Sequence, residues 1–168
     1  MSSLVVLEAY NMKWVEMYNV DKHLIENVLH GKCLEIFHVG STSIPGMTAK
    51  PIIDIAVLMT SFDLLTEEVI QQLQEIGYEY VHKEHFPNRR FFRKGEWGAG
   101  THHLHIYRTE NKEWKDIITF RNYMRKHRDV RIAYEQLKLK LAACHDRIVY
   151  TKLKGPFIQE ILQKATKR

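Results

Sequence analysis

A glycine-serine pair, a loop and an acidic strand form the part of the chain best suited to chemistry. Gly40 and Ser41 open the loop STSIPG, and twelve residues separate Ser41 from Asp54 in the apolar strand PIIDIAVLM. Glycine lets a phosphate approach the backbone, and serine adds a hydroxyl donor. We therefore predict a phosphate site that includes Thr42 and Ser43, with Asp54 as metal ligand and catalytic residue. An ordinary turn and a core strand whose acid binds backbone amides are the alternative.

The acidic strand lacks the second carboxylate that a magnesium site normally uses. Two such acids stand two residues apart on one face of a strand, and residue 56 is alanine. His103 and His105 in HHLHIY share one face of a strand for the same reason. One aspartate and two histidines suit zinc, manganese or iron better than magnesium. Polar lining or a proton shuttle is the alternative for this pair, and His38 is a further candidate.

Basic side chains elsewhere could neutralise phosphate charge. Lys50 stands four residues before the acid, and NRRFFRK places Arg93 among phenylalanines, a combination that can stack a base and hold phosphate. Lysines of the C-terminal region could line the phosphate end of a cleft. The alternatives are a solvated strand edge for Arg93 and solubilising surface positions for the lysines.

The pattern of apolar residues predicts the elements that carry these side chains. We expect a helix capped by Asn11, two strands, a second helix capped by Asp63, three strands with a glycine-rich turn at 95–100, and helices from residue 112 onward. This order predicts an α+β fold with a mixed β-sheet, flanking helices and a helical C-terminal tail. We expect a single domain, with a sheet-bearing core at about 1–110 and the tail at about 111–168.

Length and composition limit the class of protein. The chain has 168 residues, 45% hydrophobic and 27% charged, which fits one globular domain. Its net charge of +5 suits a nucleotide and also weak association with RNA. The two cysteines lack zinc-site spacing, and no apolar run reaches the ~18 residues of a membrane span. We expect a cytoplasmic protein with no membrane partner.

The segment HVGSTSIPGMTAKPIIDIAV closely resembles the signature of the GrpB family, whose fold is that of the nucleotidyltransferase superfamily, the DNA polymerase beta type. The resemblance covers nearly the whole chain, including YNMKW, GYEY, HHLHIY, FRNYMRKH, YEQLKLKLA and YTKLKGPFIQEIL. In active members of the superfamily, Gly-Ser holds the triphosphate, and two or three acids hold two magnesium ions. The resemblance implies Gly40 and Ser41 in the phosphate loop and Asp54 as the first acid, whereas Ala56 departs from the pattern.

The same resemblance implies that the strand of His103 and His105 lies beside that of Asp54, with His105 as ligand or base. It also favours Lys138 and Lys154 among the lysines of the tail. The resulting hypothesis is a protein that binds a nucleotide or phosphate ester, and that transfers nucleotides with magnesium, manganese or zinc if it is an enzyme.

Two other functions compete with this hypothesis. One is a non-catalytic binding module, which the resemblance links to coenzyme A because GrpB-like domains occur fused to dephospho-coenzyme A kinases. The other is an RNA-associated protein, which rests on the basic composition and the segment RRFFRK.

Overall fold

The computed structural model describes residues 5–109, 111–144 and 146–167. Its elements follow the predicted order. They are α1 (Lys13–Val28), β1 (Cys33–Val39), the short 3-10 helix η1 (Ser41–Ser43), β2 (Ile53–Met59), a second 3-10 helix η2 (Phe62–Leu64), α2 (Glu67–Glu75), β3 (Glu79–Val81), β4 (Arg89–Glu96), β5 (Ala99–Arg108), α3 (Lys112–Lys126), α4 (Arg128–Cys144) and α5 (Arg147–Thr166). The predicted α+β fold is confirmed.

The five strands form one mixed sheet in the order β1-β2-β5-β4-β3. β2 and β5 are parallel neighbours, and the other neighbouring pairs are antiparallel. The register places Asp54 opposite His103 and Ala56 opposite His105. Because directly opposed residues of neighbouring strands point to the same face, this register brings the acid and both histidines to one face of the sheet.

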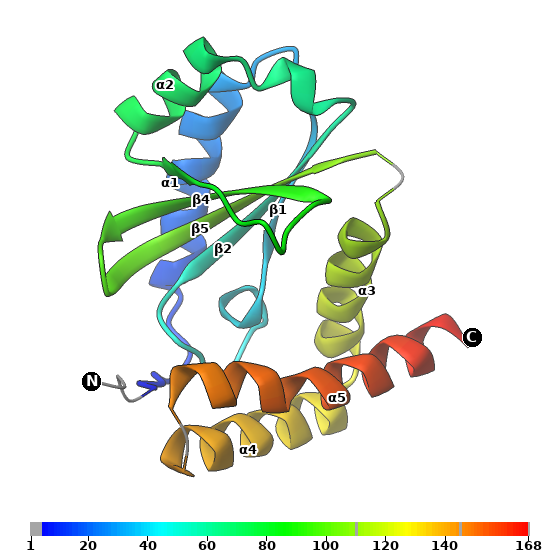
Figure 1. Cartoon of the computed structure of the whole chain (residues 1–168). Helices are drawn as coiled ribbons and strands as arrows, with labels where there is room; N and C mark the ends of the chain where they lie inside the picture. The colour runs from blue at the N-terminus through cyan, green and yellow to red at the C-terminus, as the bar shows by residue number, and fades with distance from the viewer. Residues whose placement is uncertain (1–4, 110, 145, 168) are drawn as a thin grey trace.

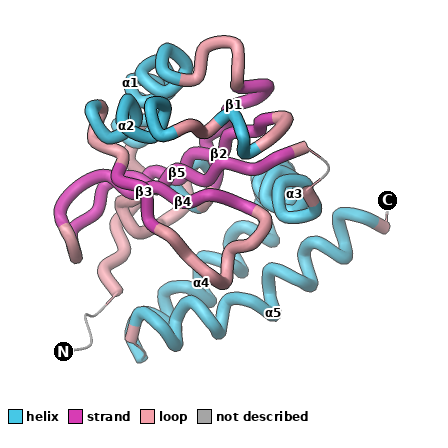
Figure 2. The backbone as a smooth tube through the Cα atoms, turned by 45° about the horizontal axis from the view of Figure 1, so that its top comes forward, coloured by secondary structure: helices cyan, strands magenta, loops and turns pink. Residues whose placement is uncertain are grey.

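Side-chain alternation along β2 divides the sheet into two different faces. Ile53, Ile55 and Val57 pack against α1 and α2 in the largest core cluster. Asp54 and Ala56 point to the other face, where α3, α4 and α5 lie (Figures 1 and 2). The acid is therefore held by a strand whose other side is anchored in the main core.

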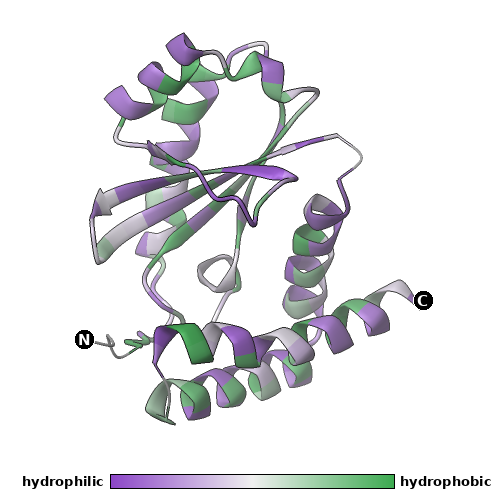
Figure 3. Ribbon diagram, in the orientation of Figure 1, coloured by the Kyte–Doolittle hydropathy of each residue, from purple (hydrophilic) through white to green (hydrophobic). Residues whose placement is uncertain are grey.

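The helical tail is joined to the loop that follows β1. Ile44 and Met47 of this loop are fully buried against Met124 of α3 and Tyr134 of α4. Hydrophobic and hydrophilic residues are interspersed along α4 and α5 (Figure 3), and Phe157 and Ile158 of α5 pack against the same cluster. No helix among the described residues is long and apolar enough to span a bilayer.

Two local predictions need correction. Asp63 does not cap the second helix, because it lies in η2 and its backbone N–H donates to the Ser61 hydroxyl; the cap of α2 is Thr66, whose hydroxyl accepts from Val69 N. The predicted turn at 95–100 is shorter than expected, since Glu96 and Ala99 already pair across the hairpin. Short polar residues compete for the capping role, so spacing alone did not identify the cap.

Candidate functional site

Gly40 brings the backbone of the predicted phosphate loop against Asp54. It has φ 70° and ψ −177°, a conformation that residues with a Cβ rarely adopt. A Cβ at this position would overlap the Asp54 carboxylate. The glycine is thus required both by its backbone conformation and by the close approach of the acid.

The hydroxyls of the loop have different surroundings. Ser41 lines the cleft described below. Thr42 also lines it, but its hydroxyl donates to Ile52 O at 3.1 Å and lies 3.0 Å from His38 Nε2. Ser43 is buried, and its hydroxyl donates to Gly40 O at 2.7 Å. The side chains of Thr42 and Ser43 therefore hold the loop together, which leaves Ser41 to face a ligand.

Two arginines of α3 donate hydrogen bonds to backbone carbonyls of this loop and of the strand before it. Arg125 donates twice to Ser43 O, at 3.1 and 2.7 Å, and Arg121 Nη1 donates to His38 O at 3.2 Å. Burial lowers the pKa of His38 to about 4, so this imidazole is neutral at pH 7. His38 consequently acts as part of the loop support and does not join the acid and the two other histidines.

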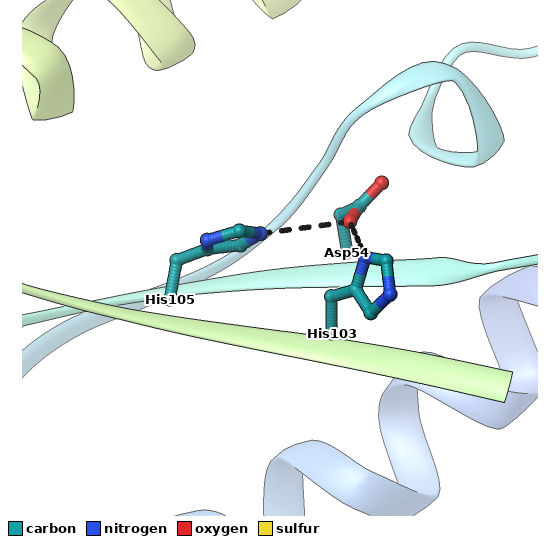
Figure 4. A group of neighbouring side chains, drawn as sticks. All are labelled: Asp54, His103 and His105. Carbon is teal, nitrogen blue, oxygen red and sulfur yellow. Dashed lines mark ion pairs between the residues drawn. The ribbon is translucent and has the colours of Figure 1, made fainter. Parts of the chain in front are cut away.

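Asp54, His103 and His105 converge on one point (Figure 4). Asp54 Oδ1 lies 3.2 Å from His103 Nδ1 and 3.7 Å from His105 Nε2. One ligand atom from each residue falls within 4.8 Å of the other two. The group is half-buried, so it faces a cleft and remains open to a ligand.

The protonation states of this group suit ligand binding. Burial alone would raise the pKa of the Asp54 carboxyl, but the hydrogen bonds and charges of the two histidines outweigh burial and hold that pKa below its usual range. Burial lowers the pKa of His105, against an opposing effect of Asp54. An ionised carboxylate and a neutral imidazole are the forms that bind metal ions.

The position of the missing second acid is filled by apolar packing. Ala56 is fully buried and packs with Val39, Tyr107 and Trp114. A carboxylate here would displace this packing and be buried against two aromatic rings, with only the His105 imidazole of the neighbouring strand beside it, at a high cost in free energy. The site therefore does not fit the pair of magnesium ions that two strand acids would hold.

Beside Asp54 lies a cleft of about 230 Å³ that we call the lysine lobe. Its walls combine the loop after β1 with one face each of α4 and α5. The residues that line it are Ser41, Thr42, Lys50, Ile52, Asp54, His103, Lys138, Arg147, Tyr150, Thr151 and Lys154. Three of the predicted phosphate-binding lysines are thus brought together next to the acid.

The cations of the lysine lobe are forced close together. Lys50 Nζ and Lys154 Nζ lie 4.8 and 4.5 Å from the centroid of the Tyr150 ring. Lys138 is only 1% exposed and donates to Thr48 O. Burial, reinforced by neighbouring cations, lowers the pKa of Lys50 to about 8 and that of Lys138 to about 7. Such a cluster is stabilised when an anion binds.

A second, larger cleft of about 550 Å³ adjoins the first and is called the aromatic lobe. Arg93 lines it and lies on the face of the sheet that carries His103, its partner in the register. Arg93 Nη1 lies 3.5 Å from Glu79 Oε2, and its guanidinium carbon lies 4.1 Å from the centroid of Trp97. The lobe is lined by Ile52, Val81, Lys83, Phe86, Phe91, Arg93, Trp97, Gly98, Gly100, His103, His105, Arg147 and Thr151.

Several residues that line these clefts were not predicted from the sequence. Arg147 and Thr151 line both lobes, and Tyr150 lines the lysine lobe. With Lys154 they follow the spacing i, i+3, i+4, i+7, which places them on one face of α5. That spacing was the available signal. Trp97, at the tip of the hairpin, left no periodic signal.

Comparisons with known proteins identify the relatives of this chain. The GrpB protein family matches residues 4–164. UPF0157 protein YqkA of Bacillus subtilis is 34% identical over 146 residues. The matched segment covers 87% of this chain and 42% of that relative's length. Glutamate-rich protein GrpB of Alkalihalophilus pseudofirmus is 32% identical, with 95% of each protein covered.

Solved structures agree with the sequence relatives. The conserved protein GrpB from Enterococcus faecalis has a TM-score of 0.88 and 35% identity, over 96% of this chain and 98% of that one. The Cid1 poly(U) polymerase, bound to Mg and 3′-dATP, has a TM-score of 0.53 and 12% identity, over 79% of this chain and 41% of that one. At that identity the likeness shows a nucleotidyltransferase-like fold alone. By its sequence and its fold, the chain belongs to the GrpB family.

Proposed function

We propose that this protein binds a nucleoside triphosphate or a related phosphate ester, with its phosphates in the lysine lobe and a single divalent metal ion at Asp54. One observation carries the proposal. The group of Asp54, His103 and His105 opens directly onto the lysine lobe, because Asp54 and His103 line that lobe as well. A negative polyphosphate would relieve the repulsion among the lysines while its metal-binding oxygens face the carboxylate.

The donor set selects the kind of metal. One carboxylate and two imidazoles suit zinc, manganese or iron, whereas magnesium prefers oxygen ligands. His105 Nε2 faces the acid at 3.7 Å from Asp54 Oδ1, and its other ring nitrogen, Nδ1, is buried and has no hydrogen-bond partner among the described residues. A bound ion of this kind would act as a Lewis acid on a phosphoryl oxygen.

The protein's own residues would perform the remaining work. Lys50, Lys138 and Lys154 hold and neutralise the phosphates, and Ser41 contributes a hydroxyl donor. His105 serves as metal ligand or, without a metal, as a base. The reaction class most consistent with this arrangement is nucleotidyl transfer, as the nucleotidyltransferase-like fold would suggest.

Calorimetric titration tests the proposal. Nucleoside triphosphates and coenzyme A precursors are titrated with magnesium, manganese or zinc into the natural protein, Asp54→Ala and the surface control Asp63→Ala. We expect the tightest binding with manganese or zinc and its loss in Asp54→Ala only. Binding that ignores both the metal and the Asp54 substitution would overturn the metal-dependent and catalytic parts of the proposal.

A non-catalytic binding module is the second candidate, and the packing of Ala56 favours it. Because this residue is fully buried among apolar side chains, the usual second acid would have to be buried with them at a cost in free energy. Incorporation of label from a labelled triphosphate separates the two candidates. Metal-dependent binding without turnover, across a range of acceptors, would favour the module.

The geometry gives less support to RNA association through RRFFRK. Arg93 is 8% exposed and lies by Glu79, while Arg89 Nη1 lies 3.3 Å from Glu113 Oε2. The basic groups of this strand are therefore engaged within the protein. Loss of RNA binding on raising salt, with no affinity for nucleotides, would revive this hypothesis.

A further inference from the structure

The aromatic lobe has the composition of a site for a flat, anionic ligand. Phe86, Phe91 and Trp97 contribute rings, while Lys83 and Arg147 contribute positive charge. None of the described residues that line it is acidic. Aromatic rings beside cations are the usual surroundings of a stacked base that carries phosphate.

Trp97 is the most conspicuous of these rings. It is 73% exposed, whereas Trp14 and Trp114 are buried. The guanidinium of Arg93, held by Glu79, lies against its ring at 4.1 Å. This contact positions the indole at the hairpin tip while most of its surface stays available to a ligand.

The two lobes form one continuous path past the acid. They share Ile52, His103, Arg147 and Thr151. At about 230 Å³ the lysine lobe is smaller than the ~300–1,000 Å³ of typical ligand pockets, so phosphates can occupy it but a whole nucleotide cannot. The base of a bound nucleotide must therefore lie in a neighbouring lobe.

A third cleft on the opposite side of Asp54 is less suitable for that base. It is lined by Glu113 and Asp116 of α3 in addition to Asp54, together with the cations Arg89 and Lys154. Arg89 pairs with Glu113 at 3.3 Å, so these two charges offset each other and Asp116 adds a negative one. The aromatic lobe instead combines Lys83, Arg93 and Arg147 with no acid among its described lining residues, which suits an anionic nucleotide better. Charge thus favours the aromatic lobe over this third cleft.

We propose that the aromatic lobe binds the base of the nucleotide whose phosphates occupy the lysine lobe. This inference rests on the proposed function and names the substrate class: an aromatic base joined through a sugar to a chain of phosphates. The base stacks at Trp97, and the phosphate nearest the sugar passes Asp54 and His103. Stacking tolerates any base, so the lobe does not select strictly among bases. Purines should bind somewhat more tightly because their larger rings make more stacking contact.

Titrations with ATP and with inorganic tripolyphosphate, which has no base, test this inference. Trp97 is the reporter, since it alone of the three tryptophans is exposed. We expect ATP to quench its fluorescence and to bind about tenfold more tightly than tripolyphosphate, the effect of one stacking contact. Trp97→Ala should remove that advantage without changing tripolyphosphate binding, and Trp97→Tyr should retain most of it.

Lys154→Ala separates the two levels of the proposal. This variant should weaken ATP and tripolyphosphate equally, because Lys154 acts on phosphate alone. If ATP has no advantage over tripolyphosphate and Trp97→Ala changes nothing, while Lys154→Ala weakens both ligands, the base lies elsewhere and the inference is overturned. If neither ligand binds, the proposed function is overturned, and this inference with it.

Discussion

Replacing Gly40 by alanine tests the link between the phosphate loop and the acid. The glycine has φ 70° and ψ −177°, and a Cβ added there would overlap the Asp54 carboxylate. Alanine would therefore have two effects, backbone strain and displacement of the acid. Gly46 provides a matched control, because it has φ 78° and no atom lies within 4 Å of a Cβ built on it.

The two effects differ in magnitude between the sites. Forcing alanine into a conformation used almost only by glycine costs of order 1–3 kcal/mol. Loss of a hydrogen bond to a charged group adds about 1.5–3 kcal/mol. We expect Gly40→Ala to lower the free energy of unfolding by about 2.5–6 kcal/mol and Gly46→Ala by about 1–3 kcal/mol, since only strain applies at Gly46.

Urea denaturation measures the stabilities, and calorimetry measures zinc or manganese binding. Gly40→Ala should lose the metal because Asp54 turns away from His103, whereas Gly46→Ala should keep it. Equal loss of stability in both variants, together with unchanged metal binding by Gly40→Ala, would show that the close approach of Gly40 to Asp54 does not organise the site.

Three further predictions follow from buried groups. Ala56→Asp should lower the free energy of unfolding by about 3 kcal/mol or more without creating magnesium affinity, because the new carboxylate is buried and displaces the packing against Tyr107 and Trp114. Urea denaturation and calorimetry measure these two effects. The pKa of His38 falls from 6.5 to about 4 on folding, so the unfolded chain binds this proton at a higher pH than the folded protein does. The free energy of unfolding should therefore decrease by about 3 kcal/mol as the pH falls from 6.5 to 4. Urea denaturation measures this decrease, which should be smaller in His38→Gln. Binding of tripolyphosphate should make the protein take up about one proton near pH 8, because the bound anion raises the pKa of Lys138 from about 7 and that of Lys50 from about 8. Calorimetry in buffers of different ionisation enthalpy measures this uptake, which should fall in Lys138→Met.

The sequence predicted those parts of the site that lie on neighbouring strands. Alternation places His103 and His105 on one face of a strand without any knowledge of the fold, and the family resemblance supplies the pairing of β5 with β2. The fold class followed from the order of apolar patterns in the same way. Local rules were sufficient wherever the relevant residues are a few positions apart.

The parts that escaped prediction depend on contacts between distant segments. Lys50 and Lys154 were each predicted as phosphate ligands, but their contact with the same Tyr150 ring, across about a hundred residues of chain, was not. The inward turn of the Thr42 and Ser43 hydroxyls depends on acceptors at Ile52 and Gly40. No periodicity encodes such meetings, because they arise from how the tail packs on the loop.

The packing of Ala56 determines what kind of site can exist here. If the space beside Ala56 were open, a water molecule or a second ion could take the place of the missing carboxylate. The rings of Tyr107 and Trp114 pack there instead. The ligands that remain are Asp54 and two histidines of the neighbouring strand, which together offer one metal position with nitrogen character. Charge that two magnesium ions would otherwise neutralise must then be met by protein cations. Lys50, Lys138 and Lys154 line the cleft beside Asp54. Under the proposed function, this division of labour between one metal and three lysines would account for both the missing acid and the crowded cations.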